Sequence, residues 1–202
     1  MAEKEKINYI DIAKDILSNE ISALKSVEKS FNAEFEKAVD FIYTTTGRIF
    51  VSGIGKSGQI GCKIASVFSS VGISSSFIHP VEAIHGDFGS LRQNDLLILL
   101  SNSGNTKELQ ALHDFGKYHG LRTISITGNK NSWLSTNCDA NIVYEIGSEA
   151  ISGFPVPTSS CLATLAIADA MTACLMKKRH FTQDEYLVYH PGGSIGERLK
   201  EK

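Results

Sequence analysis

Two short segments of this sequence carry the residue types that bind phosphate groups in proteins. The apolar residues 96–100 end at a segment that reads Ser101-Asn102-Ser103-Gly104-Asn105-Thr106. Small hydroxyl residues around a glycine allow a tight turn, and they present N–H and O–H donors at the start of a helix, where an anion is favoured. We therefore predict a phosphate-binding turn with contacts from Ser101, Asn102, Ser103 and Thr106.

A second glycine-rich segment, Gly53-Ile54-Gly55-Lys56-Ser57-Gly58, follows the strand-like residues 48–52 and adds a lysine. It predicts further substrate contacts at Gly55 and Ser57. The spacing also satisfies the Gly-x-Gly-x-x-Gly pattern of dinucleotide-binding proteins, which have an acidic residue about 20 positions later for the ribose. The nearest acid here, Glu82, lies beyond a proline. A sugar phosphate is therefore favoured over a nicotinamide cofactor.

The elements that must position these segments alternate between strand and helix. The predicted strands are 48–52, 74–78, 95–100, 122–127 and 141–146, and the predicted helices lie near 57–71, 106–119, 130–137 and 158–178. Continuous apolar strands joined by helices indicate a doubly wound, flavodoxin-like α/β fold with a five-stranded parallel sheet flanked by helices. Both glycine-rich segments fall at carboxyl ends of strands, which is where such sheets bind ligands.

An all-helical segment precedes the first strand. Apolar residues recur at helical spacing from Ile7 to Tyr43, which predicts one or two amphipathic helices. We expect residues 1–45 to form a helical arm that packs on its own domain or on a partner subunit, and residues 46–202 to form the α/β domain. The link between the second and third strands, residues 79–94, lacks the pattern of a full helix.

Composition excludes several classes of protein. The 202 residues are 42% hydrophobic, which favours one large domain, and 20 Lys and Arg against 22 Asp and Glu give no basic surface for nucleic acid. No apolar run approaches the roughly 18 residues of a membrane span, so a cytoplasmic protein is expected. The four cysteines do not have the spacing of metal ligands, and we interpret them as reduced thiols. His79 and His85 are spaced like a pair of metal ligands, but Pro80 argues against a shared helix face, so no metal site is expected. No cofactor is expected either.

Five ordered motifs together carry a family resemblance. They are Gly55-Lys56-Ser57-Gly58, His79-Pro80-x-Glu82-Ala83-x-His85-Gly86-Asp87, Ser101-Asn102-Ser103-Gly104, Pro157-Thr158-Ser159-Ser160 and His190-Pro191-Gly192-Gly193-Ser194-Ile195-Gly196. In this order they resemble the arabinose-5-phosphate isomerase family of sugar isomerase (SIS) domains, from about residue 10 to the end. The serine turn alone indicates only the wider sugar-phosphate-binding superfamily. The two histidine motifs narrow the resemblance to the arabinose-5-phosphate isomerase family.

The resemblance implies an activity and an assembly. It implies interconversion of D-ribulose 5-phosphate and D-arabinose 5-phosphate, the first step of Kdo biosynthesis for lipopolysaccharide or capsule. It also implies a SIS fold and a homotetramer whose active sites borrow residues from neighbouring subunits. Most family members continue into a pair of CBS domains, whereas this sequence ends soon after Arg198, so a short form without CBS domains is expected. Asn105 replaces the family's usual acid, and Ile151-Ser152 replaces its Cys-Pro.

Isomerisation requires a base, a donor for the enediolate oxygen and an acid that returns the proton. The acid-base set comprises four residues, namely Lys56, Glu108, Glu149 and His190, and the resemblance matches these positions together with His85. Glu149, just after the fifth strand, is the first choice of base, while the roles within the set stay open. Further substrate contacts are expected from His85, Thr158 and Ser159.

Each assignment has a structural alternative. Glu108 could complement a helix dipole, Glu149 could be a solvated loop acid, and His190 could hydrogen-bond backbone in a tight turn. The chain as a whole could be a non-catalytic sugar-phosphate sensor or an isomerase of another phosphosugar. A Kdo-type product could also bind the phosphate turn as a feedback inhibitor, a hypothesis that competitive titration against substrate tests.

Overall fold

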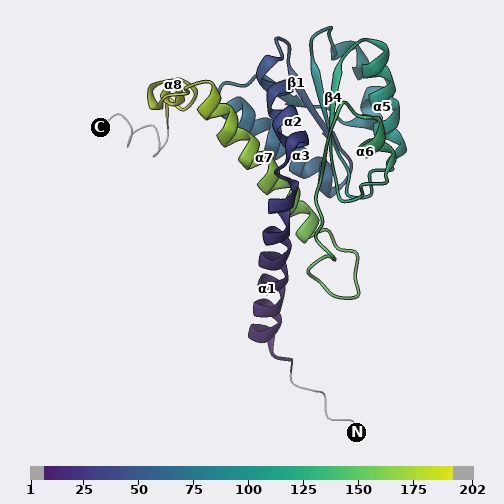
Figure 1. Cartoon of the computed structure of the whole chain (residues 1–202), viewed down its shortest axis with the longest axis vertical. Coiled ribbons are helices and arrows are strands. Elements are labelled where there is room, and N and C mark those ends of the chain that lie inside the picture. Colours follow the sequence, from purple (N-terminus) through teal and green to yellow (C-terminus); the bar gives the residue numbers. More distant parts are fainter. Residues whose placement is uncertain (1–6, 193–202) are drawn as a thin grey trace.

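The computed structural model describes residues 7–192, which form a parallel five-stranded sheet with helices on both faces (Figure 1). The strands are β1 (Ile49–Gly53), β2 (Ser75–Phe77), β3 (Leu96–Leu100), β4 (Arg122–Thr127) and β5 (Ala140–Val143). Their order in the sheet is β2-β1-β3-β4-β5, and every neighbouring pair is parallel. The predicted doubly wound α/β fold is therefore confirmed.

Eight α-helices and two short 3₁₀ helices are present in the described part of the chain. The α-helices are α1 (Tyr9–Val27), α2 (Ala33–Thr44), α3 (Lys56–Ser70), α4 (Pro80–Ile84), α5 (Lys107–Tyr118), α6 (Trp133–Asn137), α7 (Ser159–Lys178) and α8 (Gln183–Tyr189). The 3₁₀ helices are η1 (Glu28–Ser30) and η2 (Asp87–Ser90). The link before β3 thus contains α4 and η2 in place of one full helix, as its sequence predicts.

Two helices differ from the sequence prediction. α6 begins only at Trp133, because Ser132 caps it and accepts a hydrogen bond from Ser135 N. α8 was not predicted at all. Its signal is a capping box, in which Thr182 and Glu185 each accept a backbone hydrogen bond from the other residue. This short helix determines where the histidine motif that follows it begins.

Each face of the sheet has its own hydrophobic core, and β3 contributes to both. Leu96, Ile98 and Leu100 pack on the side covered by α2, α3 and α7, whereas Leu97 and Leu99 pack on the side covered by α4, α5 and α6. Successive side chains of a strand point to opposite faces, so a strand covered on both sides must be apolar throughout. This requirement explains the uninterrupted leucine and isoleucine run, which is fully buried.

The two helices of the N-terminal segment differ in their packing. α2 belongs to the core through Phe35, Val39 and Ile42, all buried. α1 buries only Ala23 and Val27, near its C-terminal end, and its N-terminal half extends beyond the body of the molecule (Figure 1). Asn19 Nδ2 donates to the carbonyl of Ala150 at 3.1 Å, so α1 lies alongside the segment that follows β5.

α7 is the one helix, among the described residues, that is long and apolar enough to cross a membrane by length and composition. Half of its most apolar window is buried inside the fold, where Ile167, Met171 and Leu175 join the core. The core helix of a globular domain passes the same test, so α7 is explained by its packing on the sheet.

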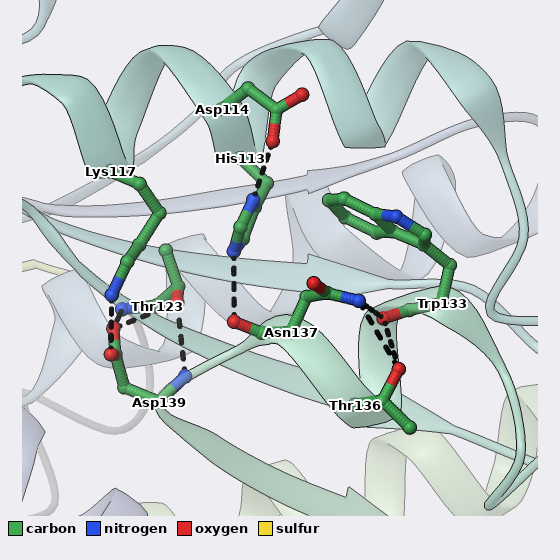
Figure 2. Close-up of polar contacts among 8 residues, drawn as sticks. All are labelled: His113, Asp114, Lys117, Thr123, Trp133, Thr136, Asn137 and Asp139. Atoms are coloured by element: carbon green, nitrogen blue, oxygen red, sulfur yellow. Dashed lines mark hydrogen bonds and ion pairs between the residues drawn. The ribbon is translucent and has the colours of Figure 1, made fainter.

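A buried histidine connects α5 to α6 (Figure 2). His113 Nε2 lies 3.1 Å from the carbonyl of Asn137, and its Nδ1 lies 3.0 Å from Asp114 Oδ1. The ring also meets Trp133 edge to face, with 4.8 Å between centroids. Both ring nitrogens and one ring edge therefore have protein partners, which explains this histidine as a structural residue of the helix layer.

A neighbouring carboxylate joins α5 to the start of β5 (Figure 2). Asp139 Oδ1 accepts from Lys117 Nζ at 2.6 Å, and Oδ2 accepts from the backbone N and the hydroxyl of Thr123 at 2.8 and 2.9 Å. Burial acts to raise the pKa of Asp139, but the hydrogen bonds from Lys117 and Thr123 outweigh it and hold the pKa below its ordinary value. The ionised carboxylate therefore stabilises the fold.

We predict that Asp139→Asn lowers the free energy of unfolding by about 1–2 kcal/mol at pH 7, because it removes the charge that Lys117 and Thr123 bind. The stabilisation is present above the ordinary pKa of 3.8 and is lost as the pH falls through the lower folded-state value, so the difference from the native protein narrows in acid. Urea denaturation measures it. Asp15→Asn, on the exposed part of α1, is the matched control, and equal stability of the two variants at pH 7 contradicts the prediction.

Candidate functional site

The two phosphate-binding segments predicted from the sequence lie side by side. In the sheet, β2 lies on one side of β1, and the chain then crosses back so that β3 lies on the other side of β1. The strand order therefore reverses between β1 and β3. Gly53, the last residue of β1, is the register partner of Leu100, the last residue of β3. Ligands of doubly wound sheets bind in the crevice at such a switch point. The topology therefore brings both glycine-rich turns to one edge of the sheet, at the position where such folds bind ligands.

The turn after β3 directs three hydroxyl groups toward one another. Ser101 Oγ lies 2.9 Å from Thr106 Oγ1 and 3.4 Å from Ser103 Oγ, and it accepts from Gly104 N at 3.0 Å. Gly104 has φ +68°, and a Cβ there would lie 2.0 Å from Ser132 Oγ, so only glycine fits this turn. The first backbone N–H groups of α5 follow directly. This arrangement suits a phosphate group.

The turn after β1 supplies the lysine. Gly55 precedes α3, Ser57 lies in its first turn, and Lys56 is the exposed first residue, whose Nζ donates to Gln59 Oε1 at 3.3 Å. A cation at a helix N-terminus is electrostatically unfavourable. The position of Lys56 therefore indicates a role in binding negative charge rather than in stabilising its own helix.

Glu149 caps the N-terminus of α7. Its Oε2 accepts from Thr158 N at 2.8 Å, Thr158 Oγ1 at 3.1 Å and Ser160 N at 3.2 Å, and its Oε1 accepts from Ser160 Oγ. Burial acts to raise the pKa of Glu149, but hydrogen bonds from Ser160 and Thr158 outweigh it and hold the pKa below its ordinary value. Glu149 is thus a fixed anion with four donors, and the interpretation as a solvated loop acid is wrong.

The thiol of Cys161, in the first turn of α7, lies within electrostatic reach of both Glu149 and Lys56. Burial raises the pKa of this thiol, the charge of Glu149 raises it further, and Ser160 and the positive charge of Lys56 act in the opposite direction. Both charges therefore act on the first turn of α7, at the carboxyl edge of the sheet. Ser159 Oγ, in the same turn, is buried without a hydrogen-bond partner among the described residues.

Glu108 and His85 belong to the same edge. Glu108 is the second residue of α5, half-buried, and its carboxylate has no hydrogen-bond or ion-pair partner within the described part of the chain. His85 ends α4, which begins beyond the carboxyl end of β2, and its imidazole is exposed. Lys56, Glu108, Glu149 and the predicted contact residues thus share one edge of the sheet.

His190 lies apart from this group within one chain. It follows α8, and the ring of the preceding Tyr189 packs against Gly72, close to the amino ends of β1 and β2. Its Nδ1 lies 3.0 Å from the carbonyl of Tyr186, and its ring stacks on that of Tyr186 at 3.9 Å. α8, which the sequence analysis missed, is the reason for this placement. Residues 193–196 of the motif lie outside the described residues.

The structure adds two residues to the site. Ser160 donates to Glu149 from both its backbone N and its hydroxyl, and it stands in the Pro-Thr-Ser-Ser motif, which was its only signal. Tyr144, just after β5, donates from its phenol to Asn102 Oδ1 at 3.0 Å. No spacing in the sequence marks that contact. Within residues 7–192, no cluster of three or more His, Cys, Asp and Glu side chains could hold a metal ion.

Comparison with known proteins extends these observations. The SIS domain family model matches residues 42–173. Arabinose 5-phosphate isomerase KdsD of Pseudomonas aeruginosa is 37% identical over 98% of this chain and 61% of its own length. Arabinose 5-phosphate isomerase KpsF of Escherichia coli O6:H1 is 38% identical over 94% of this chain and 58% of its own length. The chain thus spans about three fifths of these curated relatives.

A solved structure agrees with the family model. Protein c3406 of Escherichia coli CFT073, in complex with arabinose 5-phosphate, superposes with a TM-score of 0.86 at 34% identity. The match covers 92% of this chain and all of that protein chain. The family model covers the sheet with both phosphate turns and most of α7, and the solved structure shares the whole fold. This chain therefore belongs to the SIS domain family.

Proposed function

We propose that this protein is an aldose-ketose isomerase that interconverts D-ribulose 5-phosphate and D-arabinose 5-phosphate. The observation that carries the proposal is the pair of phosphate-type turns at the switch point, with Lys56, Glu108 and Glu149 on the same edge. The relatives named arabinose 5-phosphate isomerase and the solved neighbour in complex with arabinose 5-phosphate support the same substrate.

The proposed reaction proceeds through an enediol. A base removes a proton from C1 of ribulose 5-phosphate, the electron pair forms the C1–C2 double bond, and the C2 oxygen becomes an enediolate. Protonation at C2, with the C1 hydroxyl proton returned to the C2 oxygen, gives the aldose. Both electrons stay in the substrate, so the reaction balances without a redox partner. Lys56 would stabilise the enediolate charge, because its exposed ammonium lies at this edge.

The hydrogen bonds support different roles for the two carboxylates. Glu149 already accepts four hydrogen bonds and has a lowered pKa, which makes it a weak base and a firm support for α7. Glu108 is half-buried at the start of the helix that follows the phosphate turn, and among the described residues its carboxylate has no partner. We therefore propose Glu108 as the base and Glu149 as the residue that fixes Thr158 and Ser160.

The assembly is also part of the proposal. Four exposed residues of α1, Ile10, Leu17, Ile21 and Leu24, have exposed fractions of 67%, 57%, 45% and 37%. Their spacing places them on one stripe of the helix, because successive residues are rotated by about 100°. Such a stripe favours packing against a second copy, as the expected homotetramer requires. His190, remote within its own chain, would then serve the site of a neighbouring subunit.

The proposed biosynthetic role follows from the relatives and the resemblance. The product would supply Kdo biosynthesis for lipopolysaccharide or capsule, and a Kdo-type product would compete for the phosphate turn after β3. This feedback proposal rests on the anion-binding character of Ser101, Ser103 and Thr106. Inhibition that is competitive with ribulose 5-phosphate supports it, and its absence at about millimolar product contradicts it.

The activity is predicted to appear in an NMR time course with ribulose 5-phosphate in deuterated buffer. We expect arabinose 5-phosphate to form with solvent deuterium at C2, because an enediol takes its new proton from a group that exchanges with water. Glucose 6-phosphate and ribose 5-phosphate are parallel substrates that test for another phosphosugar isomerase. Binding of a pentose phosphate without product or exchange instead identifies a sugar-phosphate sensor.

Substitutions of the two carboxylates are predicted to have different effects on activity and on stability. Glu108→Gln should slow proton exchange at C1 at least about 100-fold with little change in melting temperature, because a general base contributes on that order. Glu149→Gln should lower the free energy of unfolding by about 1–2 kcal/mol, because α7 loses its charged cap, and should retain measurable exchange. The same NMR assay and thermal denaturation measure both. The reverse pattern assigns the base to Glu149.

The stripe on α1 gives a prediction about assembly. Replacing Leu17 and Ile21 together by glutamate should reduce the oligomer to smaller species, because two charges would enter an apolar contact. Light scattering coupled to gel filtration measures the mass. Ser22→Glu, exposed and about 120° from the stripe, is the control. An unchanged mass for the double variant shows that α1 takes no part in the contact.

A further inference from the structure

Asn102 is the one amide side chain among the four predicted contacts of the phosphate turn. It forms a hydrogen bond with the buried phenol of Tyr144. Tyr144 is only 1% exposed, and its hydroxyl donates to Asn102 Oδ1 at 3.0 Å. Asn102 itself is exposed at the carboxyl edge of the sheet. The contact therefore connects a buried phenol to an exposed amide side chain at the carboxyl edge of the sheet.

The surroundings leave Asn102 little freedom. Its carbonyl accepts from Gly128 N at 3.0 Å and from Thr127 Oγ1 at 3.3 Å, so the loop after β4 fixes its backbone. A Cβ on Gly128 would lie 2.4 Å from Asn102 Oδ1 and 3.1 Å from a ring carbon of Tyr144. Glycine at this position thus provides the space in which the amide oxygen meets the phenol.

The orientation of the amide decides what it can bind. A carboxamide has one acceptor oxygen and two N–H donors. With its oxygen committed to Tyr144, the outward group of Asn102 is the donor end, which suits the oxygens of a phosphate or a sugar. The reverse orientation would present a carbonyl oxygen to an anion. Burial raises the pKa of Tyr144 to about 12, although a hydrogen bond with Thr164 acts in the opposite direction, and the charge of Glu149 adds a smaller increase, so the phenol keeps its proton.

We propose that Tyr144 is a positioning residue, which holds the Asn102 carboxamide with its N–H donors toward a bound phosphosugar. This inference rests on the proposed function for the nature of its ligand. It assigns to Tyr144 an effect on affinity rather than on chemistry, because the phenol is almost completely buried and acts through its hydrogen bond to Asn102. The expected signature is a change in KM that leaves kcat nearly constant.

The test is a double-mutant cycle on the full chain, with arabinose 5-phosphate binding measured by calorimetry and KM and kcat by the NMR assay. Tyr144→Phe removes only the hydroxyl, and we expect Kd and KM to rise about threefold to tenfold while kcat changes less than about twofold. Asn102→Ala should weaken binding at least as much. The double variant should bind no more weakly than Asn102→Ala alone, because the two groups act as one.

Two further variants separate positioning from damage to the fold. Gly128→Ala crowds the contact without altering either partner, and it should reproduce the effect of Tyr144→Phe. Tyr118→Phe, 87% exposed on α5, is the matched control and should bind like the native protein. Melting temperatures of all variants are compared, so that a lost affinity is interpreted only beside a retained fold.

The outcomes distinguish this inference from the proposed function. Native affinity in Tyr144→Phe, or losses that add fully in the double variant, overturns the role of Tyr144 even if the protein is an isomerase. A native protein that binds arabinose 5-phosphate without turnover refutes the isomerase, while a non-additive binding cycle still supports Tyr144. A native protein that binds no pentose phosphate refutes both.

Discussion

The parallel pairing of β1 with β3 is the constraint on which the site depends. Because Gly53 and Leu100 are register partners, the two strands end at the same level, and the turns that follow them cannot be separated. Each helix of a right-handed crossover must return across the sheet, so α3 and α5 both begin at this edge with unpaired N–H groups. A favourable place for an anion is therefore built into the topology, and the side chains refine it.

Three of the helices that begin at this edge, α3, α5 and α7, differ in the groups at their N-termini. α7 is already neutralised by the Glu149 carboxylate, which accepts hydrogen bonds from its first turn. α5 follows a turn of hydroxyl groups, and α3 begins with Lys56, a cation that its own helix does not favour. The protein thus supplies an internal anion at α7, whereas the starts of α3 and α5, with Lys56, are the places where the proposed phosphate would bind. Under the proposed function, this division would limit the repulsion between the Glu149 carboxylate and a bound phosphate, because the charge of Glu149 is already engaged by α7.

Local sequence predicts most of the fold, because the strands are buried on both faces and must be apolar. All five strands lie within the predicted ranges or differ from them by one to three residues at an end. The serine turn was equally predictable, since its residue types act within six consecutive positions. The contacts of Tyr144 with Asn102, and of Glu149 with Ser160, were not predictable, because they depend on strand order and helix docking. The missed helix α8 had only a capping box as its signal, and the placement of His190 was missed with it.

The separation of His190 from the other motif residues bears on how the site is completed. Lys56, Glu108 and Glu149 share the carboxyl edge of the sheet, whereas α8 places the ring next to His190 against Gly72, near the amino edge. Tyr189 of α8 packs against Gly72 at the amino ends of β1 and β2, so moving α8 within one chain would break that contact. A second copy can bring a histidine to the crevice without this cost. Under the proposed function, catalysis would depend on association through the apolar stripe of α1, because one chain keeps its own His190 away from the carboxyl edge.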